Sequence, residues 1–446
     1  MLILDFAVQL LPVAAFLLMG WQAPLTLPVF VLPFLMMLWQ GISVASLETG
    51  AYSQELMTTT FRTGASLRFA AASLALVLAY WFVSRVALRG FREDAAAGRT
   101  EAPPTMLALL VALAAASAAG LMFYAPTVPD FARRLFLESN PEPIRDLIFK
   151  YLPFVAFGAG FSAVLSRQTV TRYSAYLSIM ALVYVLVRFG NKFSGIADLC
   201  GSFYMAVLII FASSAAARRR WRECAMGTCA LALFSMMAMN HAFGAYIHRS
   251  DKPAAAGPIE TELETRASGR NYLMERIFLM QGGLWWVTDH RVVSNEKPAG
   301  LAALAQYTRQ YPDLDDPLNA FLIEKGVSYE RMRYVVIEKG SPYTGTFPAI
   351  FYELAGPWGP VLFCLLTGAV LALCASYLAA KVAKQQILLA FIALSILLPV
   401  YNTASSGEFL RIHVPHLAVK VGLALAAEFC LRKKWFPKPA TAAHEK

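Results

Sequence analysis

Some eleven apolar runs constrain what this chain can fold into, each roughly the 20 residues that a helix needs to cross the hydrocarbon core of a bilayer. The composition agrees, because only 15% of the residues are charged, whereas soluble domains carry about 25%. We therefore predict an all-α polytopic integral membrane protein with about 11 transmembrane helices. The runs cover residues 3–21, 25–42, 66–84, 104–124, 148–166, 174–190, 196–216, 224–246, 357–380, 387–403 and 414–430.

Clusters of Lys and Arg follow every second run from the third onward, and they predict an orientation. By the positive-inside rule, the side that carries these clusters is cytoplasmic. The N-terminus and the polar segment 247–346 are then predicted to lie on the outer side, and the C-terminus inside. These clusters also account for much of the net charge of +10, so the charge does not indicate nucleic-acid binding. The clusters are Arg85, Arg89, Arg92 and Arg99; Arg167 and Arg172; Arg218, Arg219, Arg220 and Arg222; Lys381 and Lys384; and Arg432, Lys433 and Lys434.

This order predicts three parts. Residues 1–246 form an N-terminal transmembrane bundle of about eight spans, 247–346 a large outer loop with short helices, and 347–446 a C-terminal part of about three spans with a cytoplasmic tail. Within the loop, apolar residues at helical spacing predict an amphipathic helix lying on the bilayer surface. They are Leu273, Ile277, Met280 and Leu284. An outer loop of about 100 residues with helices of its own is usually functional.

Motifs for nucleotide or metal chemistry are missing from the sequence. It contains no phosphate-binding Gly-Lys-Ser/Thr loop, no His-Glu-x-x-His and no Gly-x-Ser-x-Gly. The Asp-x-Asp at Asp313 and Asp315 directly precedes Asp316 and Pro317, which favours a turn and helix start over a metal site. The six cysteines show no zinc spacing. We therefore expect no metal and no cofactor.

Cations on the predicted outer side run against the topological bias and need another explanation. Arg188 and Lys192 stand where the sixth run reaches the outer surface, and Arg270, Arg276 and Arg291 flank a Trp pair, Trp285 and Trp286. Arginine offers a planar fork for phosphate oxygens, so these residues and Arg411 are candidates for binding an anionic substrate. Snorkelling of Arg188 remains an alternative. The Trp pair and Tyr343 are candidate substrate contacts, although the indoles also suit a bilayer anchor.

Three residues are candidate general bases. His290 follows Asp289, Glu353 lies close to the ninth run among aromatic neighbours, and Glu408 belongs to the last outer segment. Two of them have an alternative role: a lone histidine is more often structural, and Glu353 could instead pair with an outer arginine.

Two stretches and the overall layout resemble the bacterial oligosaccharide repeat-unit polymerases, which extend O-antigen, capsule or exopolysaccharide chains. The stretches are Arg276 to Trp286, containing Gln281-Gly282-Gly283, and Tyr343 to Gly359, with Thr-Phe-Pro followed by Glu-x-x-Gly-x-x-Gly. The resemblance implies a bacterial inner-membrane protein with a periplasmic loop and an architecture like that of the GT-C glycosyltransferases. It also implies metal-independent, inverting transfer from an undecaprenyl-pyrophosphate-linked glycan. The other implied partners are the lipid bilayer, a chain-length regulator and a flippase.

Other functions remain open at this point. An O-antigen ligase uses the same class of donor and has a similar topology. A transporter or flippase of a lipid-linked or anionic substrate would favour charges at mid-membrane depth and repeated halves, and we find neither in the sequence. A non-catalytic scaffold of polysaccharide assembly is the fourth alternative. The arginines of the loop argue weakly against that alternative.

Overall fold

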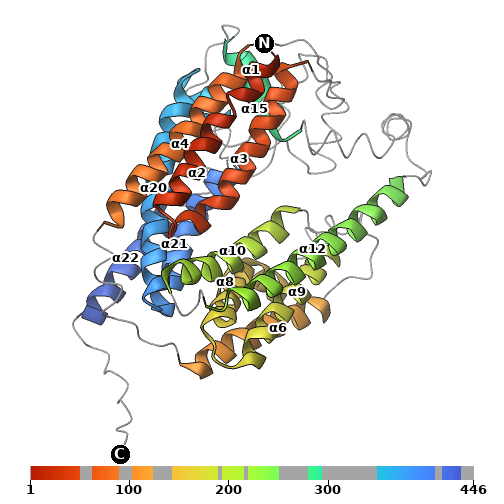
Figure 1. Ribbon diagram of the computed structural model, residues 1–446, viewed down its shortest axis with the longest axis vertical. Coiled ribbons are helices and arrows are strands. Elements are labelled where there is room, and N and C mark those ends of the chain that lie inside the picture. The colour runs from red at the N-terminus through yellow and green to blue at the C-terminus, as the bar shows by residue number, and fades with distance from the viewer. Residues whose placement is uncertain are drawn as a thin grey trace, which may run out of the picture. The chain divides into compact units, whose positions relative to one another are not determined.

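The structure is a computed structural model that describes residues 2–50, 63–89, 103–123, 143–188, 193–214, 219–250, 280–293, 349–406 and 414–432. Within these ranges every regular element is a helix and none is a strand. The helices sort into two compact units, which Figure 1 shows. The units cut across the predicted divisions of the chain, because the first unit combines Met1–Arg92 with Asn271–Leu378 and Leu388–Lys446. The second unit combines Glu93–Arg270 with Ala379–Ile387.

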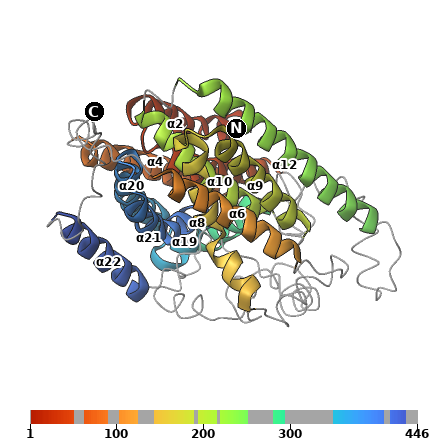
Figure 2. The ribbon, with the colours of Figure 1, turned by 90° about the horizontal axis from the view of Figure 1, so that it is seen from below.

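The first unit contains nine of the described helices. They are α1 (Leu2–Ala7), α2 (Leu10–Gln22), α3 (Leu27–Glu48), α4 (Ala65–Ala87), α15 (Met280–Val293), α19 (Ala349–Ala355), α20 (Gly359–Ala383), α21 (Ile387–Ser406) and α22 (Val414–Arg432), except that the last five residues of α20 and the first of α21 fall in the second unit. The second unit contains α6 (Pro104–Phe123), α8 (Pro143–Leu165), α9 (Thr169–Arg188), α10 (Phe193–Ser213) and α12 (Trp221–Ser250). In Figures 1 and 2, α12 extends beyond the neighbouring helices of its unit.

Eight helical stretches among the described residues are long and apolar enough to cross a membrane. They match eight of the predicted runs, and α10, α12 and α22 are helical at the positions of the other three. In α10 the apolar stretch, Asp198–Ser213, is shorter. The prediction of a helical protein is therefore confirmed for the described residues, and their long apolar helices are compatible with a multi-pass membrane protein. The count of about 11 spans, the membrane and the side of the loop stay predictions.

Polar contacts inside the first unit hold the start of the chain against α4. The break between α1 and α2 leaves Gln9 buried, and its amide donates to the carbonyl oxygen and the Oγ of Ser66 at 3.0 and 3.1 Å. The hydroxyl of Ser66 in turn donates to the carbonyl oxygen of Asp5 at 2.8 Å. Buried polar groups are costly unless they are hydrogen-bonded. These bonds therefore fix how the first apolar run packs on the third.

Aromatic rings and a glycine fill the interior of the same unit. Phe30 stacks on Tyr80 with ring centroids 4.3 Å apart, and the Tyr80 hydroxyl donates to the carbonyl oxygen of Thr26 at 2.8 Å. A side chain at Gly368 of α20 would place its Cβ 2.6 Å from the carbonyl oxygen of Leu76 in α4. Small residues at such positions allow membrane helices to approach closely. Gly368 therefore permits close contact between α20 and α4.

In the second unit, α8 contacts α6, α9 and α10. Ser162 of α8 donates to the carbonyl oxygen of Leu107 in α6 at 2.8 Å. On another face of α8, a Cβ at Gly160 would lie 2.4 Å from the carbonyl oxygen of Phe203 in α10. The glycine thus sets the distance between α8 and α10.

Replacing Gly160 with leucine is expected to destabilise the protein by about 1–3 kcal/mol, the usual cost of overpacking. The backbone carbonyl that the new side chain meets has no rotamer into which it can move. Thermal unfolding of the purified protein in detergent measures the effect. Gly422→Ala is the control, because nothing lies within 4 Å of its Cβ position. Equal midpoints for the two variants would contradict the close α8–α10 contact.

Candidate functional site

Helix α15, from the polar segment between the eighth and ninth runs, packs on the ends of α3 and α4 and on α19. Its Gly282 lies against the backbone of α3, where a Cβ would be 2.6 Å from the nitrogen of Val44 and 2.7 Å from the carbonyl oxygen of Gln40. The Gly282 amide donates to Ser43 Oγ at 2.8 Å. The Gly-Gly motif therefore begins a helix that is docked on α3 along its first turn.

The N-terminal end of α4, on which α15 packs, is held by a carboxylate of α3. Glu48, near the end of α3 and 4% exposed, accepts the backbone amides of Thr63, Gly64 and Ala65, each at 3.2 Å. Gly64 stands at the N-cap with a φ of 80°, a left-handed conformation that glycine adopts without strain, and it has no side chain to cap the helix. Glu48 therefore satisfies amides that the helix leaves unpaired and places negative charge at the positive end of its dipole.

A buried ion pair joins α15 to α4. Asp289 is 0% exposed, and the guanidinium of Arg68 holds it with two bonds of 2.6 Å, Nε to Oδ1 and Nη2 to Oδ2. The hydroxyl of Thr63 donates to Asp289 Oδ2, also at 2.6 Å, and Arg68 Nη2 donates to the Thr63 carbonyl oxygen. Two-pronged pairs of this kind are strong and directional. The pair fixes both the position and the rotation of α15.

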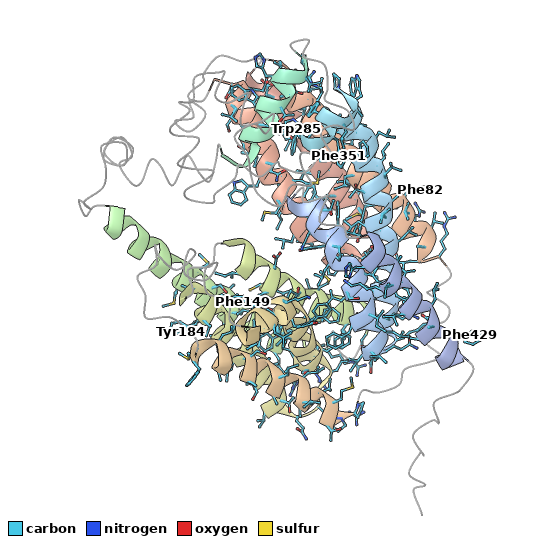
Figure 3. All side chains as sticks on the ribbon, turned by 180° about the vertical axis from the view of Figure 1, so that it is seen from behind. Phe82, Phe149, Tyr184, Trp285, Phe351 and Phe429 are labelled. Atoms are coloured by element: carbon cyan, nitrogen blue, oxygen red, sulfur yellow. The ribbon has the colours of Figure 1, made fainter. Side chains whose placement is uncertain are left out.

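Aromatic rings complete the contact between α15 and α19. Trp285 is fully buried and meets Phe69 edge-on at 4.9 Å and Tyr352 at 4.7 Å between ring centroids. Figure 3 shows Trp285 near Phe351 of α19. Tyr352 is also fully buried, and burial together with the charge of Asp289 raises its pKa well above the ordinary value. Its phenol therefore stays neutral at physiological pH. We call Glu48, Thr63, Arg68, Asp289 and Tyr352 the docking cluster.

Two buried donors at the docking cluster make no hydrogen bond of good geometry among the residues that the structure describes. They are the Nε1 of Trp285 and the hydroxyl of Tyr352, which lies beside Arg68 and Asp289. A buried polar group without a partner costs about 1–3 kcal/mol. These groups therefore add to the polarity of a contact that already holds the Arg68–Asp289 ion pair.

Several predicted site residues lie on the helices that meet here. His290, half-buried, and Arg291 follow Asp289 on α15, and Glu353 follows Tyr352 on α19. Both indoles of the Trp pair are 0% exposed, so neither ring presents an open face in this structure. Their predicted contact with a substrate stays a prediction. Arg188 is the last residue of α9, in the second unit.

The remaining predicted residues fall outside the described ranges. They are Lys192, Arg270, Arg276, Tyr343, Glu408 and Arg411. The amphipathic stripe is described only from Met280 onward, where α15 begins. In the described ranges, no three His, Cys, Asp or Glu side chains come together to hold a metal ion.

The sequence reasoning missed Glu48, Thr63 and Arg68 as members of this cluster. Glu48 and Arg68 were detectable as charged residues at the edges of apolar runs, where burial requires a partner. Thr63 carried no comparable signal. Chemically, the arrangement is a tightly paired support: Arg68 and Asp289 compensate each other, the Glu48 carboxylate is held by backbone amides, and His290 and Glu353 are attached to it by the backbone.

Residues 325–419 match a protein family described as "Family of unknown function (DUF6418)". The matched segment includes α19, α20 and α21. No curated protein matches the chain, and no solved structure matches it. The described part of the chain is thus helical, with eight helical stretches that are compatible with a multi-pass membrane protein.

Proposed function

We propose that this protein is an inner-membrane glycosyltransferase that polymerises undecaprenyl-pyrophosphate-linked oligosaccharide repeat units at the periplasmic face. One observation carries the proposal. The two stretches on which the resemblance rests, the one ending at Trp286 and the one running from Tyr343 to Gly359, are far apart in sequence but meet through Trp285 and Tyr352 at 4.7 Å. Residues with candidate roles, His290 and Glu353, are therefore held on adjoining helices.

The reaction balances without a nucleotide or a metal. A hydroxyl oxygen of the acceptor repeat unit attacks the anomeric carbon of the donor sugar, from the side opposite the pyrophosphate. The bond from that carbon to the pyrophosphate oxygen breaks, and the lipid pyrophosphate leaves with the electron pair. The hydroxyl proton passes to a general base, for which His290, Glu353 and Glu408 are the candidates.

Cations stabilise the charge that develops on the leaving group. We assign this role to Arg188, Lys192, Arg270, Arg276, Arg291 and Arg411. Arg68 is assigned a supporting role instead, because Asp289 already occupies its fork. The proposal places the polyprenyl tails against the apolar helices.

The proposal predicts the glycan profile of a strain that lacks this protein. Single repeat units on the lipid core, with the polymer ladder lost, are the expected result on a gel or by mass spectrometry. Wild type should restore the ladder, and Arg276→Ala and Arg188→Ala should restore at most about a hundredth of it, since one stabilising donor contributes about 10²–10³ in rate.

Arg85→Gln is the matched control for these variants. Arg85 is an exposed arginine whose Nη1 donates to Oε1 of Gln22 at 3.2 Å. A strain that carries Arg85→Gln should produce the same glycan ladder as wild type. Loss of all core-attached glycan while polymer accumulates on the lipid carrier would instead establish a ligase. An unchanged ladder in the deletion strain would overturn both assignments.

A further inference from the structure

A second cluster of charge lies in the other unit, where the turn between α8 and α9 meets the start of α12. Arg172 of α9 pairs with Glu223 of α12. Arg220 donates from Nη1 to the carbonyl oxygen of Ser166 at 3.2 Å. The segments 166–172 and 219–224 together carry five arginines and, in Glu223, one carboxylate. Glu223 offsets the charge of one of these five arginines, so the two segments together carry a net positive charge.

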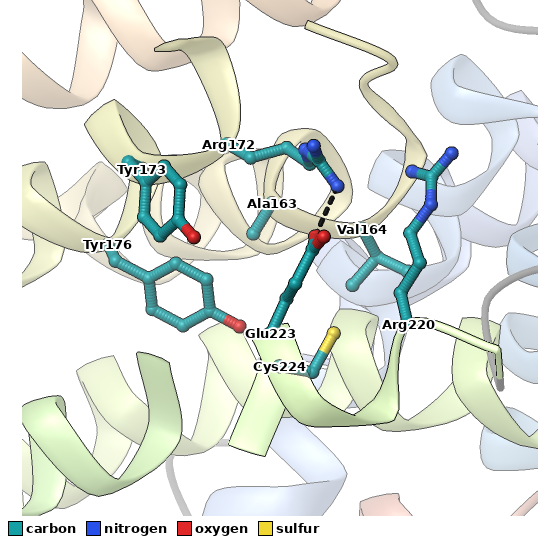
Figure 4. Close-up of a pocket in the computed structure, with 8 residues that line it drawn as sticks. All are labelled: Ala163, Val164, Arg172, Tyr173, Tyr176, Arg220, Glu223 and Cys224. Atoms are coloured by element: carbon teal, nitrogen blue, oxygen red, sulfur yellow. Dashed lines mark hydrogen bonds and ion pairs between the residues drawn. The ribbon is translucent and has the colours of Figure 1, made fainter. Parts of the chain in front are cut away.

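A small cavity opens between these side chains (Figure 4). Its volume is about 10 Å³, which is enough for a single water molecule or one ligand oxygen. Arg172, Tyr173, Tyr176, Arg220 and Glu223 belong to its lining. Figure 4 shows the hydroxyl of Tyr176 directed toward α12 and the guanidinium of Arg172 directed toward Glu223.

Two donors of the lining residues make no hydrogen bond of good geometry in the part of the chain that the structure describes. They are Nε of Arg172 and the hydroxyl of Tyr176, a residue that is 7% exposed and lies beside Cys224 and Thr228. The tyrosine ring packs against Gly227, where a Cβ would lie 2.7 Å from Cζ of the ring. An arginine Nε only donates and a phenol donates readily, so the missing partner is an oxygen acceptor, and the surrounding arginines favour an anionic one.

An exposed apolar stripe begins at the mouth of the cavity. On α9, Val170, Tyr173 and Leu177 are 79%, 46% and 63% exposed, and their spacing of three and four residues places them on one face. Tyr173 belongs both to this face and to the cavity lining. At the start of α12, Trp221 is 56% exposed, and the guanidinium of Arg222 lies 5.7 Å from its ring centroid. Exposed tryptophan beside arginine is typical of the bilayer interface.

We propose that this end of the second unit binds the headgroup of an anionic phospholipid. A phosphate oxygen at the mouth accepts from Tyr176 and Arg172, Arg220 supplies further positive charge, and an acyl chain follows the stripe from Tyr173 to Leu177. Basic pockets between membrane helices bind anionic headgroups in this way. Free phosphate would use the cations but not the stripe. The inference concerns the second unit alone and does not depend on the proposed glycosyl transfer.

The test is lipid retention by the full-length protein in detergent, measured by native mass spectrometry. Phosphatidylglycerol and phosphatidylcholine are added in equal amounts, and the phosphatidylglycerol-bound fraction is expected to dominate. Arg220→Gln should lower the apparent affinity for phosphatidylglycerol about fivefold, the usual effect of one arginine near an anionic surface. Arg85→Gln, a single charge removal in the first unit, is the matched control and should leave the affinity unchanged.

Tyr176→Phe keeps the proposal testable if an arginine variant folds poorly. It removes a hydroxyl that makes no hydrogen bond of good geometry in the described structure, so the thermal midpoint should not fall, while phosphatidylglycerol retention should. Leu177→Gln should also reduce retention. Equal retention of the two lipids, or Arg220→Gln and Tyr176→Phe variants that retain phosphatidylglycerol like wild type, would overturn the proposal. Competition by millimolar inorganic phosphate with no effect of Leu177→Gln would overturn the lipid assignment in favour of free phosphate.

Discussion

Replacing Asp289 with alanine is expected to destabilise the protein by about 3 kcal/mol, the low end of the cost of breaking a buried ion pair. The low end applies because the side chain of Arg68 is 18% exposed and retains some contact with solvent. The variant leaves the guanidinium without its carboxylate and Thr63 without its acceptor. Thermal unfolding of the purified protein measures the loss. Under the proposed function, the glycan ladder should also shorten or vanish, because α15 would lose its anchor on α4.

A double variant separates the charge from the packing at the same place. Arg68→Met with Asp289→Leu removes both charges and keeps apolar volume, which in other buried pairs is often neutral or stabilising. Its thermal midpoint should lie well above that of Asp289→Ala. A single variant within about 0.5 kcal/mol of wild type, the range of ordinary surface substitutions, would show that Arg68 and Asp289 do not hold α15.

The helices were predictable because the bilayer criterion is simple. An apolar run of about 20 residues has few alternatives to a helix when every backbone polar group must be satisfied internally. Even the runs interrupted by proline are helical, with Pro33 inside α3 and Pro153 inside α8. Boundaries were harder to predict: α3 continues to Glu48, beyond the predicted end at residue 42. The last residue of α3, Glu48, is polar. Its carboxylate caps the start of α4, and these hydrogen bonds offset the cost of burying it.

The candidate site was less predictable, because long-range pairing decides it. Leu273 to Leu284 reads as an amphipathic surface helix; the structure describes this stretch from Met280 onward, where α15 buries Trp285 completely. Gly282 and Asp289 give no periodic signal. Their roles come from Val44 and Arg68, which lie more than two hundred residues earlier in the chain, and no local pattern encodes such a partner. The sequence did place Glu353 in one of the two stretches that meet, and His290 lies four residues after the end of the other.

Replacing Gly282 with leucine is expected to release α15 from α3. The new Cβ would stand 2.6 Å from the backbone nitrogen of Val44 and 2.8 Å from its Cγ2, and the bond from the Gly282 amide to Ser43 would be lost with the contact. Overpacking of about 1–3 kcal/mol raises the population of the open state about 5- to 150-fold. Hydrogen–deuterium exchange of the peptide 280–293, followed by mass spectrometry, measures this opening directly.

Gly422→Ala again provides the control, since its Cβ meets nothing within 4 Å, and the exchange of peptide 280–293 should then match wild type. The comparison with Asp289→Ala is the more informative one. Gly282→Leu changes packing and keeps every charge, whereas Asp289→Ala removes a charge and keeps the packing of Gly282. If α15 docks as a unit, both variants accelerate exchange along the whole peptide. Acceleration confined to the substituted turn in each variant would mean that α15 is held at two independent points, and that Arg68 does not set the position of His290.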